Sequence, residues 1–287
     1  MNWKQVKNLL LLLLTAVNVL LFTFVYNYYQ ESNYTDAVTA KRAAAILADS
    51  GITVASEMLS VRHDAAEVQS CEYDREEYLC YAAALLFGKE AEGIYLLPDG
   101  IRAQTTDGKV ATFGYDFSVQ YISPDADRDR LTAAWQSAKS LAEDENCKTE
   151  KNMLEELLAL PEGALKSTPC THADGYTFIT VAQSQDGIPL YGMECCFGFS
   201  GDTLIFADGK YCFSIPTQKT SEPLLNRINI LFSEKERGKT GHITDIALCY
   251  TLYEDAQNSS LLFVPAYVLT YADGERIAVS ALSGKAY

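Results

Sequence analysis

The residues best suited to chemistry in this 287-residue chain are eight cysteines and three histidines. Thiolates and imidazoles are nucleophiles and ligands for zinc, so their spacing decides what they could do. No C-x-x-C pair occurs, and none of His63, His172 and His242 lies in an H-E-x-x-H motif. Cys170 and His172 are two residues apart, but no second pair lies nearby at the spacing of a zinc site. The sequence therefore predicts no metal site and no cofactor.

The even number of cysteines leaves two interpretations open. Outside a cell they could form up to four disulfides, and they could equally be free thiols packed as small apolar side chains. On a strand, Cys195 and Cys196 would face opposite sides, which predicts one core thiol and one surface thiol. Cys196, Cys212 and Cys249 all lie opposite the more apolar face of their strands. A disulfide among these three is a further hypothesis.

Sequence motifs of enzymes are missing. The chain has no P-loop, no G-x-G-x-x-G and no G-x-S-x-G, and Lys239-Thr240-Gly241 has no S-x-x-K to accompany it. Acidic residues are so numerous that no pair can be assigned as a general acid and base. We therefore expect a protein without enzymatic activity and without catalytic residues.

The first thirty residues predict a membrane anchor. An unbroken apolar run over residues 9–26 would span about 27 Å as a helix, close to the thickness of a bilayer's hydrocarbon core. Residues suited to the membrane interface flank it: Trp3, Lys4 and Lys7 before the run, and Tyr26, Tyr28 and Tyr29 at its end. The basic side faces the cytoplasm in such proteins, which predicts a single-pass membrane protein with an extracytoplasmic domain. A cleaved signal peptide is the alternative, but no A-x-A site directly follows.

The predicted span contains three polar residues, Thr15, Asn18 and Thr23. An unpaired amide is costly to bury in lipid, and helices in membranes associate through close packing and polar side chains. We therefore expect these three residues to face a partner helix.

The formal net charge of the chain is −15. This acidity argues against binding to nucleic acid and against a polybasic attachment to anionic lipid. Its simplest role is solubility, and a basic protein partner is the alternative.

Apolar periodicity and turn residues predict an α+β fold, with helices packed on antiparallel sheets behind the transmembrane helix. Asp-Gly pairs, including Asp208-Gly209, mark hairpins.

The expected domains are the tail and span over 1–30, an α+β module over 31–123, a helical connector over 124–165 and a second α+β module over 166–287. Helices are expected over 36–50, after Pro124, around 153–158 and from Ser221; strands over 52–61, 78–87, 94–97, 101–105, 110–113, 117–122, 190–199, 204–207, 211–215, 243–253, 261–271 and 276–281.

Several segments resemble the YycI family of regulators. The start, Asn2-Trp3-Lys4 leading into a leucine-rich span, is similar to the family's opening. Asp186-Gly187-Ile188-Pro189-Leu190-Tyr191 is similar to a central family segment, and Val264-Pro265-Ala266-Tyr267-Val268 with the stretch over 277–284 is similar to its final segment. Tyr267 and Ser280 replace the family's usual Trp and Asn, and residues 53–165 carry little of the resemblance.

The resemblance implies an extracytoplasmic fold of PepSY-like modules. It also implies a non-enzymatic regulator that binds a WalK-like sensor histidine kinase of a cell-wall two-component system, together with a YycH-like sister regulator. The alternative is a binding module for a wall fragment, a peptide or a lipid, or a PepSY-like protease inhibitor.

Overall fold

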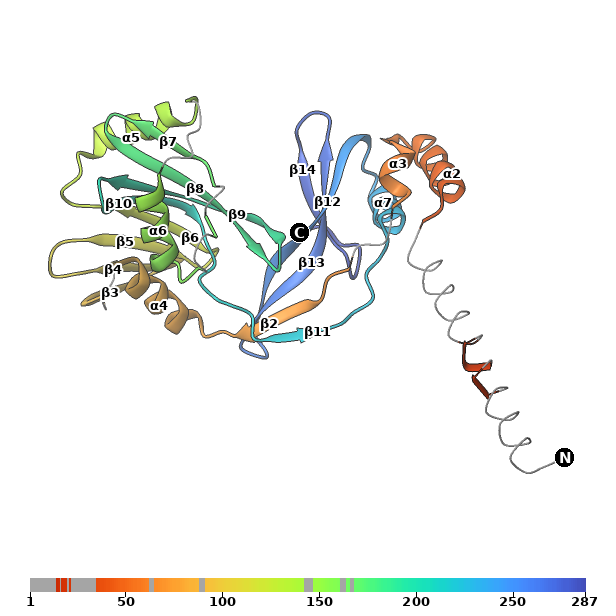
Figure 1. Ribbon diagram of the computed structural model, residues 1–287, viewed down its shortest axis with the longest axis horizontal. Helices are drawn as coiled ribbons and strands as arrows, with labels where there is room; N and C mark the ends of the chain where they lie inside the picture. Colours follow the sequence, from red (N-terminus) through yellow and green to blue (C-terminus); the bar gives the residue numbers. More distant parts are fainter. Residues whose placement is uncertain are drawn as a thin grey trace. The chain divides into compact units, whose positions relative to one another are not determined.

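The computed structural model describes residues 14–15, 17–19, 21, 35–61, 65–87, 91–141, 147–160, 164–165 and 168–287. The chain forms two compact units (Figure 1). Unit 1 comprises Met1–Ala66, Glu222–Leu248 and Pro265–Tyr287, and unit 2 comprises Glu67–Ser221 and Cys249–Val264. The division falls inside β12 (Gly241–Asp255) and β13 (Ser260–Tyr271), so neither unit is one continuous segment.

The predicted fold class is wrong. Strands dominate the described residues, with 14 of them in a single, mostly antiparallel sheet and few helices beside it. The sheet also contains parallel pairs, β1 with β12 and β9 with β12. The prediction missed part of the sheet: residues 68–72, 170–173 and 218–220 form strands that were not expected, because pairing partners far away in the sequence decide which segments become strands.

The predicted transmembrane helix and the single-pass localisation are also corrected. Among the described residues, no helix is both long enough and apolar enough to span a bilayer. Leu14, Thr15, Val17, Asn18, Val19 and Leu21 are helical, and the other residues of the expected span lie outside the described ranges.

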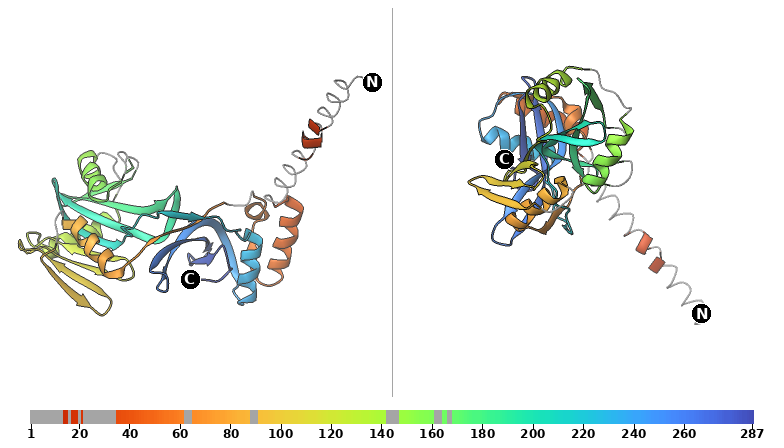
Figure 2. Two further views of the ribbon diagram at one scale, coloured as in Figure 1. Left: turned by 90° about the horizontal axis from the view of Figure 1, so that it is seen from below. Right: turned by 90° about the vertical axis from the view of Figure 1, so that its left-hand side faces the viewer.

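The described part of unit 1 contains helices, two short strands and one end of each of the long strands β12 and β13. Its elements are α2 (Ala37–Ala48), β1 (Ile52–Val54), α3 (Ser56–Leu59), α7 (Arg227–Glu236) and β14 (Arg276–Ser280), with the unit 1 parts of β12 and β13. Asp36 begins α2 by accepting hydrogen bonds from the backbone N–H groups of Val38 and Thr39, which confirms the predicted N-terminus of that helix. The helix predicted from Ser221 begins later, with Asn226 as its cap. Figure 2 shows α2 and α7 side by side.

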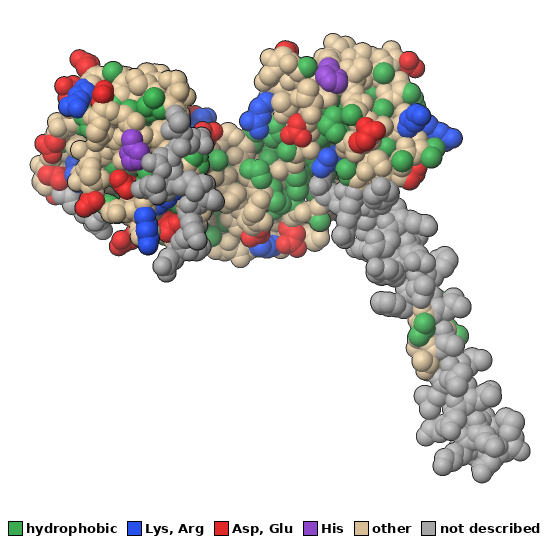
Figure 3. Space-filling model, turned by 45° about the horizontal axis from the view of Figure 1, so that its top comes forward, with side chains coloured by type: hydrophobic (Ala, Val, Ile, Leu, Met, Phe, Trp, Pro, Cys, Tyr) green, Lys and Arg blue, Asp and Glu red, His purple; other side chains and the backbone are tan. Residues whose placement is uncertain are grey.

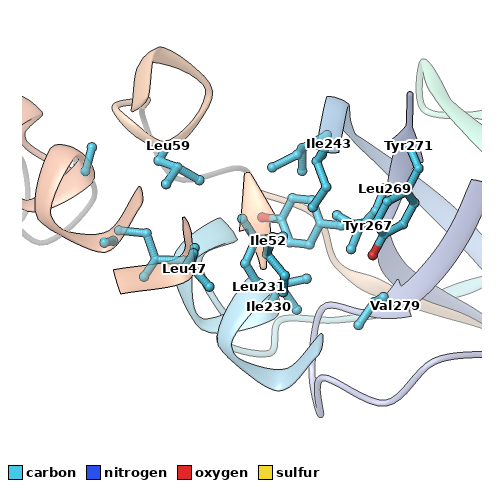
Figure 4. Packing of buried hydrophobic residues seen from close by; sticks show 14 of the residues in the cluster. Leu47, Ile52, Leu59, Ile230, Leu231, Ile243, Tyr267, Leu269, Tyr271 and Val279 are labelled. Atoms are coloured by element: carbon cyan, nitrogen blue, oxygen red, sulfur yellow. The ribbon is translucent and has the colours of Figure 1, made fainter. Parts of the chain in front are cut away.

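The core of unit 1 lies between these helices and the strands. Leu47 of α2 and Leu231 of α7 point towards Ile52 and Tyr267, all of them almost completely buried (Figure 4). Each such side chain contributes about 2–3 kcal/mol through removal of apolar surface from water. The helices are therefore held by packing against the sheet.

Unit 2 is built on antiparallel strands. They are β2 (Val68–Glu72), β3 (Gly93–Leu97), β4 (Gly100–Gln104), β5 (Val110–Gly114), β6 (Ser118–Ile122), β7 (Cys170–Ala173), β8 (Tyr176–Gln185), β9 (Ile188–Ser200), β10 (Thr203–Lys210), β11 (Gln218–Thr220) and the unit 2 parts of β12 and β13. Hairpins at Asp99-Gly100 and Asp107-Gly108 join β3, β4 and β5, as predicted. The edge strand β11 pairs with β2.

The predicted hairpin at Asp208-Gly209 is wrong. These residues lie inside β10, where Gly209 pairs with Cys195 of β9 and with Val119 of β6. The φ angle of Gly209 is +140°, and a Cβ atom there would lie 2.3 Å from the carbonyl oxygen of Glu194. The glycine therefore permits close approach of two strands rather than a turn.

The helices of unit 2 among the described residues are α4 (Arg75–Phe87), α5 (Arg128–Ala138) and α6 (Lys148–Leu157). The strand predicted over 78–87 is wrong, because this segment is most of α4. Tyr78, Leu79, Ala82, Ala83 and Leu86 are buried on one face at helical spacing. Asp74 accepts hydrogen bonds from the N–H groups of Glu76 and Glu77, which starts the helix.

The six free cysteines of the structure include both members of the Cys195-Cys196 pair, and both are buried. The predicted surface thiol is therefore wrong, since elements cover both faces of β9: Cys196 belongs to a core cluster with Leu131 and Ala134 of α5. None of Cys196, Cys212 and Cys249 is disulfide-bonded, so the disulfide proposed among them is also wrong. The disulfide that does form joins Cys147 to Cys170.

Candidate functional site

The candidate site is a groove of about 750 Å³ in unit 2, called here the tyrosine groove. It is formed by the end of β2, the start of α4, the segment that follows β10, and the turn between β12 and β13. Its lining residues are Cys71, Glu72, Tyr73, Asp74, Glu77, Tyr78, Tyr81, Phe213, Ser214, Ile215, Thr217, Gln218, Asn258 and Ser259. Backbone hydrogen bonds from Tyr73 N to Ser259 O and from Thr217 N to Ser70 O, both 2.8 Å, hold these segments together.

Tyr78 fixes one wall of the groove. Its hydroxyl donates to the carbonyl oxygen of Tyr211 at 3.3 Å and accepts from the N–H of Phe213 at 3.2 Å. Burial raises the pKa of Tyr78 well above its usual value, so the side chain is a neutral phenol. Because Tyr78 lies on α4 and Phe213 follows β10, this side chain positions two elements that are far apart in the sequence.

Tyr73 lies beside Tyr78, with 5.2 Å between the ring centroids. It is only 5% exposed, and its hydroxyl, which lies near the guanidinium of Arg75, makes no hydrogen bond of standard geometry among the described residues. Burial, and next the charge of Glu254, raise the pKa of Tyr73. A buried hydroxyl without a well-formed hydrogen bond costs about 1–3 kcal/mol, so a ligand that makes this group accessible would gain free energy by pairing with it.

Carboxylates surround these rings. Glu72, Asp74 and Glu77 are exposed at the rim, and no lysine or arginine of the described chain pairs with Glu72 or Glu77. The nearest arginine, Arg75, is instead paired with Glu254 and lies 4.5 Å above the ring of Tyr115. The groove therefore keeps an uncompensated negative charge.

Carboxylates around tyrosine rings favour cationic ligands. A lysine or arginine side chain can pair with a carboxylate and at the same time lie over an aromatic face. Tyr81, which is 50% exposed, offers such a face at the rim. Figure 3 shows acidic side chains distributed over the displayed surface, so it is the combination with tyrosines that distinguishes the groove from general acidity.

The thiol in the groove is a poor nucleophile. Cys71 is buried, and burial raises the pKa of its thiol. The same cause raises the pKa of Cys196 to about 12 and that of Cys212 to about 12. Because the thiolate is the reactive form, these cysteines behave as apolar core residues.

The two expected site residues that the structure describes, Thr15 and Asn18, are not among the residues that line the tyrosine groove. Thr15 and Asn18 are helical and exposed, whereas Thr23 lies outside the described residues. Trp3, Lys4, Lys7, Tyr26, Tyr28 and Tyr29 also lie outside them. The partner-binding role of Thr15, Asn18 and Thr23 stays a prediction.

The groove itself was missed in the sequence. One local signal was present: the run Glu72-Tyr73-Asp74-Arg75-Glu76-Glu77-Tyr78 mixes acids with tyrosines. This run was not recognised as part of a binding surface because residues 78–87 were predicted as a strand. A strand would place Tyr78 and Tyr81 on opposite faces. As residues three apart on a helix, they share a face.

Comparisons with known proteins give no family. No family model matches the chain, and no curated protein matches it, so the resemblance to the YycI family is not confirmed. Among solved structures, the chain is similar to the Bacillus megaterium YpeB C-terminal domain, with 13% identity, a TM-score of 0.31, and coverage of 75% of this chain and 96% of that one. A likeness this distant supports no inference about activity or partners.

Proposed function

We propose that this protein is a non-enzymatic binding protein, and that its tyrosine groove takes a basic, extended segment of a protein partner. The observation that carries the proposal is that the carboxylates of Glu72 and Glu77, which form no ion pair among the described residues, line the same groove as the buried ring of Tyr73, whose hydroxyl makes no hydrogen bond of standard geometry there. Thr217 and Gln218 lead from the groove into the edge strand β11, where an extended segment could add by backbone hydrogen bonds.

The protonation states in the groove support binding rather than catalysis. Tyr73, Tyr78 and Cys71 all have a raised pKa, chiefly because of burial. Groups of this kind stay protonated at neutral pH and make weak nucleophiles and weak bases. They can instead supply shape and hydrogen-bond donors.

The resemblance to the YycI family supplies the partner class within this proposal: a WalK-like sensor histidine kinase, with a YycH-like regulator in the same complex. A partner that binds one signalling state of a kinase more tightly than the other shifts the balance between them. The proposed role is therefore regulation of a sensor kinase by binding.

Site-specific crosslinking tests the partner class. Tyr81 would be replaced by the photoreactive residue p-benzoylphenylalanine in the full chain, expressed in its own cells, with the same replacement at the exposed residue Asp202 as control. We expect a crosslink from position 81, and none from position 202, to a sensor kinase identified by mass spectrometry. Crosslinks only to non-protein wall material, or equal crosslinks from both positions, would contradict the proposal.

A peptide measurement tests the groove chemistry independently. We expect a short lysine–alanine peptide to bind the full chain, and a glutamate–alanine peptide not to bind. The double variant Glu72→Gln/Glu77→Gln should weaken binding about tenfold, since each exposed ion pair contributes up to about 1 kcal/mol. Asp202→Asn, which removes one exposed acid on the β9–β10 turn, should leave the affinity unchanged. Isothermal titration calorimetry measures all three.

A further inference from the structure

A second group of reactive side chains lies in unit 2, outside the tyrosine groove. Cys147, at the N-terminus of α6, forms a disulfide with Cys170 at the start of β7, and His172 lies two residues further along β7. The two sulfur atoms and a ring nitrogen of His172 all lie within 4.8 Å of one another. We call these three residues the Cys–His cluster.

Hydrogen bonding orients the imidazole of His172. The hydroxyl of Thr177 donates to Glu150 Oε1 at 3.2 Å, and the same oxygen lies 3.1 Å from His172 Nδ1. A hydroxyl has one proton and an ionised carboxylate can only accept, so Thr177 accepts a hydrogen bond from Nδ1–H. Nε2 therefore carries the lone pair, and it faces the sulfur of Cys147 at 3.4 Å.

This orientation is the one that metal-binding histidines have. Such residues donate one ring N–H to a carboxylate or another acceptor, and this fixes the other nitrogen towards the metal. A disulfide that only crosslinked the chain would need no such support. Both cysteines are buried while His172 is exposed, so an ion could enter from the side of the imidazole.

We propose that the Cys–His cluster is a redox-controlled zinc site. A dithiol reductant transfers two electrons and two protons to the Cys147–Cys170 disulfide, which yields two thiols and a disulfide in the reductant. One Zn²⁺ then replaces the two thiol protons and takes both thiolates and His172 Nε2 as ligands. Thiol–disulfide exchange with an oxidised dithiol, which accepts two electrons from the thiolates and two protons from solvent to become two thiols, forms the Cys147–Cys170 disulfide again and releases the ion.

The ligand set and its spacing fit zinc. Zn–S bonds of about 2.3 Å and Zn–N bonds of about 2.1 Å in a tetrahedron place ligand atoms about 3.5–3.8 Å apart. The three ligand atoms already lie within 4.8 Å of one another, so small side-chain movements suffice. Three protein ligands leave a fourth position for water.

Zinc titration of the full chain tests the proposal. The protein would be reduced with a phosphine, desalted without oxygen and titrated with Zn²⁺ against a chromophoric chelator. We expect one tightly bound zinc per reduced chain, none in the oxidised chain, and loss of this site in Cys147→Ser/Cys170→Ser, which keeps the other six thiols. His172→Gln should weaken binding at least tenfold, and Thr177→Val by about 10–100-fold, as is usual when the support of a ligand is removed. His242→Gln, in unit 1, is the control.

If reduction of the disulfide loosens the fold, the thermal stability of the reduced chain provides a second test of the proposal. Zinc should then restore the thermal transition of the reduced wild-type chain but not that of reduced His172→Gln. Co²⁺ in place of zinc should give the charge-transfer absorption of a thiolate-bound tetrahedral ion. Equal zinc binding by wild type, Cys147→Ser/Cys170→Ser and His172→Gln would overturn the proposal, because the other thiols would then be responsible.

Discussion

The tyrosine groove and the Cys–His cluster lie in the same unit but are assembled in different ways. The groove combines three segments that are far apart in the sequence, around residues 71–81, 213–218 and 258–259. The residues of the cluster and its supporting hydrogen bonds all come from residues 147–177. The groove therefore depends on the tertiary fold of unit 2, whereas the cluster depends on one covalent bond and local elements. Substitutions that affect one region and spare the other test this difference.

The largest effect is expected from Tyr78→Ala. Removal of a buried aromatic ring costs about 3–5 kcal/mol in the free energy of unfolding, and it also separates α4 from the segment that contains Phe213. Peptide binding in the groove should be lost while the Cys147–Cys170 disulfide still forms. Chemical denaturation and disulfide mapping measure the two results. Tyr78→Phe, which removes only the hydroxyl, should cost about 1 kcal/mol.

The double variant Cys147→Ser/Cys170→Ser should lose the disulfide and keep peptide binding, the reverse of what is expected for Tyr78→Ala. A disulfide that closes a loop with a sequence separation of 23 stabilises a fold by about 3 kcal/mol through the entropy of the unfolded chain. We expect a lower midpoint in denaturant and an unchanged affinity for the lysine–alanine peptide. A parallel loss of peptide binding in the still-folded variant would show that the two regions are coupled.

Tyr73→Phe separates stability from binding within the groove. The hydroxyl of Tyr73 makes no hydrogen bond of standard geometry among the described residues, so its removal should leave the free energy of unfolding unchanged or raise it by about 1 kcal/mol. The affinity for the basic peptide should fall severalfold if the ligand satisfies this hydroxyl. An unchanged affinity would place the ligand elsewhere in the groove.

The smallest effect concerns the ion pair between Asp116 and Lys210, which lies where the chain leaves β10 for the groove wall. The hydrogen bond from Lys210 lowers the pKa of Asp116 from 3.8 to about 2. A lowered pKa in the folded state adds stability above pH 3.8 and loses it as the pH falls towards 2. Since the pair is largely exposed, Asp116→Asn should cost less than about 1 kcal/mol at pH 7. The cost should vanish near pH 2, as measured by urea denaturation.

Local signals predicted local structure well. The helix after Asp36 is α2 because an aspartate cap precedes an alanine-rich stretch, and the Asp-Gly hairpins of β3, β4 and β5 lie where expected. The hairpin prediction at Asp208-Gly209 was wrong because this dipeptide also occurs where two strands approach closely. Only the position of the Glu194 backbone, which the sequence does not give, distinguishes a close approach from a turn. Tyr78–Phe87 misled because aromatic residues favour strands, although Asp74 provides a helix cap.

Neither proposed site could be predicted from the sequence, and the physical reason is the same for both. Cys170 and His172 lacked a third ligand until the fold brought Cys147, 23 residues earlier, beside them. The acidic run over 72–77 lacked a binding surface until the segment after β10 was placed opposite it. Residue spacing reports neighbours along a helix or strand, and it does not report which distant segments meet.

The division inside β12 and β13 has a consequence for synthesis. Unit 2 is complete once residue 264 has been made, but unit 1 includes the residues that come first and also requires 265–287. During translation, the core residues of α2, β1 and α3 therefore cannot pack fully until almost the whole chain has been made, because their packing partners on β13 and β14 come last. Unit 2 can fold earlier. We therefore expect unit 2 to fold before unit 1. A nascent chain stalled shortly after residue 264 has left the ribosome would contain a protease-resistant unit 2 and an exposed α2.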